Sequence, residues 1–160
     1  MAAAAACVLL AVCVTRNQTK GVVQADSDEA SILVGAGDIA DCRDLSGAEA
    51  TVKLLEQIPG TVMAVGDLAY PDGSKENFRC YEKTWGRVKA RTRPAAGNHE
   101  FHAAGATPYF DYFGTAAGDP KRGYYSYELG TWHIVVLNSE CGDDPEQTAA
   151  EGFLQPVDEP

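Results

Sequence analysis

Basic residues are scarce in this sequence, and their scarcity limits the partners that the chain can bind. Lys and Arg together number 13 against 23 Asp and Glu, which gives a formal net charge of −10 at pH 7. Nucleic-acid binding needs Lys and Arg to neutralise phosphates, so the composition argues against a nucleic-acid partner. A small phosphate ester is not excluded, because a bound metal ion can reverse the local electric field.

Several sequence motifs with a known chemistry are also missing. No Cys-x-x-Cys pair occurs, so the sequence does not predict a structural zinc site. No Gly-Lys-Ser/Thr is present, which excludes a P-loop, and no Gly-x-Ser-x-Gly is present, which removes support for an esterase elbow. The remaining candidates for chemistry are acidic, aromatic, carboxamide and histidine side chains.

A long apolar run is missing too, and the longest candidate lies at the start of the chain. Residues 1–14 are apolar and rich in Ala, but they are too few to form a stable membrane span. The length is typical of a secretory signal segment, which predicts a secreted or periplasmic protein. A start codon assigned too early is the alternative.

The rest of the chain divides into three parts. Residues 15–30 are polar and are predicted to be a linker, residues 31–141 have the patterning of a folded domain, and residues 142–160 are an irregular acidic tail. A chain of 160 residues has room for one domain or part of one. Cys42 and Cys80 are expected either to form a disulfide in an oxidising compartment or to be two buried thiols.

Strands and helices alternate in the predicted domain, which indicates an α/β fold. Short apolar runs predict strands at 31–34 and 61–65. Residues 92–96 are expected to form a third, shorter strand, although Pro94 is unusual inside a sheet. A Ser-x-x-Glu capping box at Ser46–Glu49 predicts the start of a helix that ends before Pro59, and Ser74 is expected to cap a second helix. Strand, helix and strand in this order imply a right-handed parallel unit.

Two further segments carry aromatic residues. Residues 108–113 form an aromatic cluster that is expected to pack over the floor of the loops. Residues 124–129 alternate in polarity, Gly130 marks a turn, and residues 132–138 form a strong apolar run. This pattern predicts a β-hairpin.

Each of the three predicted parallel strands ends in a glycine followed by an oxygen-bearing side chain. These side chains are Asp38, Asp67 and Asn98, and they are separated by about one βα unit. The carboxyl ends of parallel strands meet at one edge of a sheet, so the three side chains are expected to converge there, with the Tyr70 phenol close to Asp67. Converging oxygen donors repel one another unless a hard cation lies between them, so the pattern predicts a metal site.

These three turns resemble the first three motif blocks of the calcineurin-like metallophosphoesterases. The blocks are Gly37-Asp38, Gly66-Asp67-Leu68-Ala69-Tyr70 and Gly97-Asn98-His99-Glu100. The Tyr three residues after the second Asp resembles the purple acid phosphatase branch in particular. The resemblance covers about residues 32–141 and implies the N-terminal half of an αββα sandwich.

The resemblance also implies a function and residue roles. It implies hydrolysis of small phosphate monoesters by two metal ions, Fe paired with Zn, Mn or Fe. Asp38 and Tyr70 would bind the first ion, Asp67 would bridge, and Asn98 would bind the second and contact the substrate. His99 would contact the phosphate and act as the general acid.

The sequence departs from the family in its histidines. Members of the family carry further His ligands in their second half, ending in Gly-His-x-His, whereas this chain has only His99, His102 and His133. His102 is a candidate for substrate contact, and His133 lies in a predicted strand, which favours a packing role. The chain is therefore expected to be either a fragment of a longer product or a truncated copy with an incomplete site.

Two other functions remain open on the sequence alone. One is a non-catalytic remnant of such an enzyme. The other is a dinucleotide-binding fragment, because Gly35-Ala36-Gly37-Asp38-Ile39-Ala40 matches G-x-G-x-x-A after a strand. The oligomeric state is not predicted.

Overall fold

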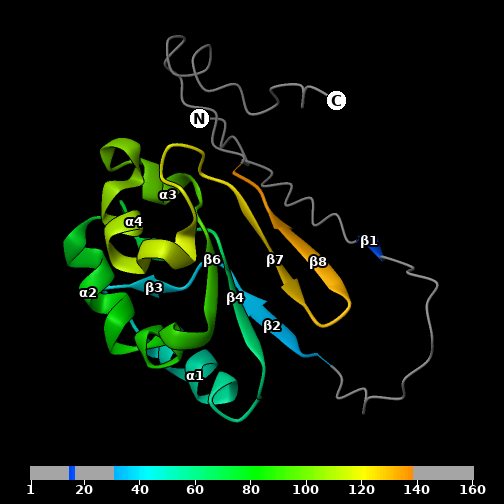
Figure 1. The fold of residues 1–160 in the computed structure, drawn as a ribbon. Coiled ribbons are helices and arrows are strands. Elements are labelled where there is room, and N and C mark those ends of the chain that lie inside the picture. The colour runs from blue at the N-terminus through cyan, green and yellow to red at the C-terminus, as the bar shows by residue number, and fades with distance from the viewer. Residues whose placement is uncertain (1–14, 17–30, 139–160) are drawn as a thin grey trace, which may run out of the picture.

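The fold is mixed α/β, as the sequence predicts, and it is built around a small parallel sheet. The structure is a computed structural model that describes residues 15–16 and 31–138 (Figure 1). The expected signal segment at 1–14 and the expected tail at 142–160 lie outside these residues. Of the expected linker at 15–30, the structure describes Thr15 and Arg16, which form the short strand β1.

The central sheet has the strand order β2-β4-β6, and all its strands are parallel. The strands are β2 (Leu33–Ala36), β4 (Thr61–Val65) and β6 (Thr92–Ala95). Strand β2 begins two residues later than predicted and continues through Gly35. A Cβ at Gly35 would lie 1.8 Å from the Met63 carbonyl oxygen, so glycine permits this close backbone pairing.

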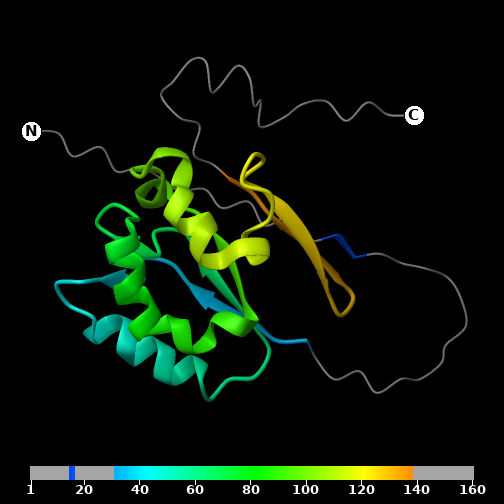
Figure 2. The ribbon, with the colours of Figure 1, turned by 60° about the vertical axis from the view of Figure 1, so that its left-hand side comes forward.

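Helical segments cover one side of this sheet, and a β-hairpin lies on its other side (Figures 1 and 2). The helical segments are α1 (Ser46–Leu55), α2 (Lys75–Lys83), the 3₁₀ segment η1 (Trp85–Arg91) and α4 (Thr107–Phe113). Their buried residues form one core with Val62 and Ala64 of β4. The predicted aromatic cluster forms α4, which packs against Phe78 and Tyr81 of α2 through edge-to-face ring contacts of Phe113.

The predicted capping box of α1 is wrong. The residue that caps this helix is Leu45, and it makes no side-chain capping bond. Glu49 instead pairs with Arg87 at 3.0 Å and with Lys53 at 3.4 Å. Arg87 and Lys53 therefore attract the Glu49 carboxylate, which in a capping box would accept a hydrogen bond from the backbone at the start of the helix.

Ser74 does cap α2, as predicted. Its side chain accepts a hydrogen bond from the Asn77 backbone N–H, and the Asn77 side chain accepts from the Ser74 backbone N–H. We expect Ser74→Ala to lower the free energy of unfolding by about 1 kcal/mol, because an N-terminal amide of the helix loses its acceptor. Urea denaturation measures this change.

Ser46→Ala is the matched control for this substitution. Ser46 is the first residue of α1 rather than its cap, and its side chain is exposed. We expect a change within about 0.5 kcal/mol. Equal losses for the two variants would contradict the assignment of Ser74 as the functional cap.

A second pair of parallel strands was not predicted from the sequence. Strands β3 (Ala40–Asp41) and β5 (Ala69–Tyr70) pair with Ala40 opposite Ala69 and Asp41 opposite Tyr70. Each strand is only two residues long, which is too short to produce a recognisable pattern of apolar residues in the sequence. The pair extends the contact between the first and second turns beyond the central sheet.

A disulfide between Cys42 and Cys80 follows directly after β3, which confirms the first of the two alternatives for these cysteines. Their Cα atoms lie 5.5 Å apart and 38 residues apart in sequence. The bond ties the chain after the first turn to helix α2, which follows the second.

The predicted hairpin is confirmed, with β7 (Tyr125–Leu129) antiparallel to β8 (Trp132–Val136). Strand β8 ends two residues earlier than predicted. Between β6 and the hairpin lie α3 (Asn98–Phe101), η2 (Ala104–Ala106) and η3 (Gly114–Ala117). Among the described residues, no helix has both the length and the apolar character that crossing a bilayer requires.

Strand β6 forms one edge of the central sheet and contains Pro94, which has no N–H to donate. The Pro94 carbonyl oxygen accepts hydrogen bonds from the hydroxyls of Tyr109, at 3.1 Å, and Tyr125, at 2.7 Å. The edge position explains how a proline is tolerated in this sheet.

Candidate metal centre

The two aspartates of the first and second turns share an uncommon backbone conformation. Asp38 has φ 54° and Asp67 has φ 53°, which places both in the left-handed region that non-glycine residues rarely adopt. Such conformations cost free energy and concentrate at functional sites, where surrounding structure holds them. Here that structure is the backbone of the neighbouring turns.

Backbone hydrogen bonds join the first turn to the second. The N–H of Asp38 donates to the Gly66 carbonyl at 3.2 Å, and the N–H of Ile39 donates to the Asp67 carbonyl at 3.0 Å. The third turn also lies against the second, because a Cβ on Gly97 would fall 2.2 Å from Oδ1 of Asp67. Only glycine permits this approach, so the three predicted turns do meet at one edge of the sheet.

The Tyr70 hydroxyl lies between the two carboxylates. It donates to Oδ1 of Asp38 in a short hydrogen bond and lies 3.2 Å from Oδ2 of Asp67. One phenol proton cannot satisfy two carboxylates. The negative charges of Asp38 and Asp67 around the Tyr70 hydroxyl are therefore not balanced by a positive charge within this group.

This environment opposes ionisation of the phenol. Burial raises the pKa of the Tyr70 hydroxyl well above its usual value, and the hydrogen bond to Asp38 and the negative charge of Asp67 raise it further. In the absence of a cation the phenol therefore keeps its proton. A bound cation would reverse these local electrostatics.

His99 faces Tyr70 across the site and is held by a backbone carbonyl. Its Nδ1 lies 2.6 Å from the Pro71 carbonyl oxygen, and its ring centroid lies 4.3 Å from that of Tyr70. A carbonyl only accepts hydrogen bonds, so Nδ1 carries a proton. Nε2 is then the nitrogen left for chemistry.

The other predicted residues fall at different distances from this centre. Asn98 is half-buried and begins α3 directly after Gly97, beside Asp67. His102 is exposed, and its ring centroid lies 4.9 Å from that of His99. His133 lies in β8, as predicted, and its Nδ1 is 2.6 Å from Oε1 of the exposed Glu128 on the adjacent strand, away from the three turns.

Glu100 is the most buried charged residue of this region, and it was not predicted from the sequence as a functional residue. Its side chain is fully buried, and its carboxylate accepts hydrogen bonds from four backbone N–H groups. Burial raises the pKa of this carboxyl, while the bonds from backbone N–H groups oppose that rise. The sequence signal was its position three residues after the cap residue Gly97, which is capping-box spacing.

The donor set consists of oxygen atoms alone. Across residues 31–138, no group of three or more His, Cys, Asp and Glu side chains has an arrangement that could hold a metal ion. The converging donors are two carboxylates and a phenol, and Asn98 lies in the third turn between Gly97 and His99, whose backbones approach Asp67. Hard cations prefer this chemistry, so the residues present fit the predicted class of metal.

The first turn lacks the geometry of a dinucleotide-binding loop. In that loop the glycine turn opens a helix whose free amides bind a pyrophosphate. Here α1 begins only at Ser46, and the N–H groups of Asp38, Ile39 and Ala40 donate to carbonyls of the second turn. The geometry therefore does not support the dinucleotide alternative.

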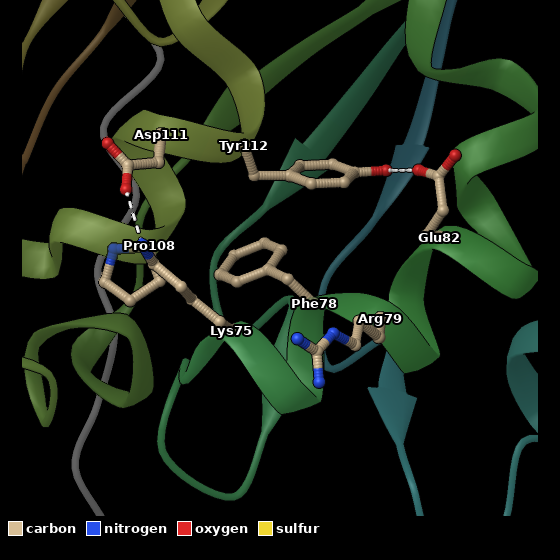
Figure 3. A pocket seen from close by; sticks show the side chains of 7 residues that line it. All are labelled: Lys75, Phe78, Arg79, Glu82, Pro108, Asp111 and Tyr112. Atoms are coloured by element: carbon tan, nitrogen blue, oxygen red, sulfur yellow. Dashed lines mark hydrogen bonds and ion pairs between the residues drawn. The ribbon is translucent and has the colours of Figure 1, made fainter.

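A separate pocket of about 310 Å³ lies between α2 and α4 (Figure 3). Phe78 and Tyr112 stack in it with ring centroids 5.1 Å apart. Lys75 pairs with Asp111 at 3.2 Å, and the Tyr112 hydroxyl donates to Glu82. These charges already have partners, so they do not indicate the charge of a ligand.

Comparisons with known proteins identified no relative of this chain. A scan of protein-family models found no match, and searches of curated proteins and of solved structures also found none. The chemistry of the three turns therefore carries the functional argument.

Proposed function

We propose that the three turns form the metal centre of a hydrolase that acts on small phosphate monoesters, of the calcineurin-like metallophosphoesterase type and its purple acid phosphatase-like branch. One observation carries the proposal: Asp38 and Asp67, both in left-handed conformations, converge on the Tyr70 hydroxyl. Strained backbone at two equivalent turns indicates selection for side-chain placement. The β2-β4-β6 sheet with its helical layer would then be one half of an αββα sandwich.

The residues present would divide between two cations and would form the oxygen-bearing part of the site, because the sequence has no Gly-His-x-His block to add nitrogen ligands. Asp38 and Tyr70 would hold the first, Asn98 the second, and Asp67 both. The bound ions, Fe with Zn, Mn or Fe, would supply Lewis-acid stabilisation of charge on the phosphoryl oxygens and activation of water. The local shortage of positive charge around Tyr70 supports this assignment.

His99 is suited to hold a proton for the leaving group. The Pro71 carbonyl fixes the ring through Nδ1 at 2.6 Å, so Nε2 is free to carry the proton that the departing alkoxide needs. His102, 4.9 Å from His99 between ring centroids, would contact the phosphate from the exposed side. Asn98 would contact the same substrate.

The Cys42–Cys80 disulfide supports a secreted or periplasmic location. Disulfides persist in oxidising compartments and are rare in the cytosol. The acidic composition supports a small ester rather than a nucleic acid as the substrate.

Metal analysis combined with turnover of p-nitrophenyl phosphate tests the proposal. We expect the 160-residue chain to bind two Fe³⁺ or Mn²⁺ ions and to hydrolyse the ester faster than the same ions in buffer. A visible charge-transfer band on loading with Fe³⁺ would report Tyr70 as a ligand. Neither binding nor turnover would indicate a non-catalytic remnant, and tight binding of NAD would favour the dinucleotide alternative.

Substitution of His99 separates proton transfer from metal binding. We expect His99→Asn to lower turnover by about 100-fold or more, because the leaving group loses its acid. Cation affinity should stay within about twofold, since His99 bonds to Asp67 through its backbone N–H, which the substitution keeps. Titration calorimetry and steady-state kinetics measure the two effects.

His102→Ala is the control for this prediction. It removes an exposed imidazole next to His99 without touching the Pro71 carbonyl. We expect a rise in KM with kcat nearly unchanged. A larger loss of kcat for His102→Ala than for His99→Asn would reverse the assigned roles.

A further inference from the structure

Glu100 joins two of the three turns although its side chain touches none of the proposed ligand side chains. Its Oε2 accepts from the N–H groups of Gly97, at 2.8 Å, and Asp67, at 3.1 Å. Its Oε1 accepts from the N–H groups of Leu68, at 2.8 Å, and Ala69, at 3.2 Å. A single carboxylate therefore binds the second and third turns together.

These bonds are more than a local helix cap. Only the bond to Gly97 is local, whereas the bonds to Asp67, Leu68 and Ala69 span 33, 32 and 31 residues. A cap would need only the first. The three long-range bonds constrain the backbone on both sides of the Asp67 side chain.

The backbones of the two turns also approach each other closely in this region. A Cβ on Gly97 would lie 2.4 Å from the Asp67 backbone nitrogen, and a Cβ on Gly66 would lie 3.3 Å from the Gly97 Cα. The His99 N–H also donates to Oδ1 of Asp67 at 3.2 Å. Small changes in this contact would move Asn98 and His99 relative to Asp67.

We infer that Glu100 is the positioning residue of the site, whose buried carboxylate sets the separation between Asp67 and the Asn98–His99 turn. This inference rests on the proposed function for its effect on cation binding. Its structural part, the link between the two turns, stands on the four hydrogen bonds alone. Partners beyond the ligands of a metal site tune its affinity in this way.

Glu100→Gln tests the inference because the amide keeps the shape of the side chain and removes one acceptor. In either orientation its NH₂ group faces two backbone donors, so one pair of amides loses its bond. We expect hydrogen exchange of either the Gly97 and Asp67 amides or the Leu68 and Ala69 amides to accelerate at least about tenfold. We also expect the affinity for Mn²⁺, measured by titration calorimetry, to fall by about 10- to 100-fold.

Val52→Ala is the matched control, since Val52 is fully buried in α1 and its side chain has no polar atom that could bond to the amides of these turns. It should lower the melting temperature without changing either readout. If Glu100→Gln fails to fold, Glu100→Asp keeps the charge on a shorter side chain and should show the same two effects. The inference is overturned if the Glu100 variant exchanges and binds Mn²⁺ like Val52→Ala.

The two readouts also separate this inference from the proposed function. If the unsubstituted chain binds no Mn²⁺, the proposed metal centre fails. Amide exchange, together with the chemical shifts of the His99 ring, then decides whether Glu100 positions the two turns. Unchanged amide exchange and unchanged His99 chemical shifts in Glu100→Gln would refute the positioning role of Glu100.

Discussion

Asp67→Asn is expected to abolish binding of both cations while leaving the cation-free protein as stable as before, or more stable. Asp67 is the proposed bridge, and the affinity of oxygen sites depends strongly on ligand charge, so we expect affinity to fall by about 100-fold or more at both positions. Asn tolerates the left-handed backbone of this position, and its carbonyl can still accept from the His99 N–H.

The stability of the cation-free variant is expected to change in the opposite direction to its cation affinity. Two carboxylates share the single proton of the Tyr70 hydroxyl, and removal of one charge relieves their repulsion. We expect a free energy of unfolding that is unchanged or raised by about 1 kcal/mol. Calorimetric titration with Mn²⁺ and denaturation in a chelator measure the two effects.

Asp111→Asn is the control for this experiment. Asp111 pairs with Lys75 at the pocket between α2 and α4 and should leave cation affinity unchanged. Retention of one cation at full occupancy in Asp67→Asn would contradict the bridging role. Loss of both affinity and folding would mean that Asp67 is structural.

Loss of the Cys42–Cys80 disulfide is expected to have the largest effect on stability. The bond closes a loop with a sequence separation of 38 residues, so the loss of loop entropy in the unfolded chain corresponds to about 4 kcal/mol. We expect the double variant Cys42→Ser, Cys80→Ser to lose stability by about this amount. Guanidinium denaturation under oxidising conditions measures it.

Reducing agent provides the internal control. Dithiothreitol should lower the stability of the unsubstituted chain to that of the double variant and should leave the double variant unchanged. A chain that is indifferent to reductant would show that the disulfide does not stabilise the fold.

The parallel sheet and the meeting of the three turns were predictable from the sequence, because each depends on local patterns. Short segments that end before a glycine predicted β4 and β6 closely, and the spacing of the turns after β2 and β4 brought Asp38 and Asp67 to one edge. The order of strand, helix and strand then left only one parallel arrangement. The position of Tyr70 followed from its distance to Asp67 along the chain.

Features that depend on distant partners were not predictable. Ser46 and Glu49 match a capping box, but Arg87, 38 residues further on, binds the carboxylate. Strands β3 and β5 are short and exist only because the two turns lie side by side. Glu100 has the spacing of a helix cap, and its three long-range bonds appear only once the second and third turns are in contact.

The Pro94 carbonyl and its two tyrosine partners prevent a further strand from pairing at the β6 edge of the central sheet and, of the two edges that the structure describes, leave only the β2 edge open to pairing. Strand β6 offers no donor at Pro94, and the acceptor there is already satisfied. An additional strand, whether from this chain or from another molecule, would find pairing groups along β2 instead, whose outer side pairs with no strand among the described residues. Protection against edge-to-edge association is thus built into one flank of the sheet.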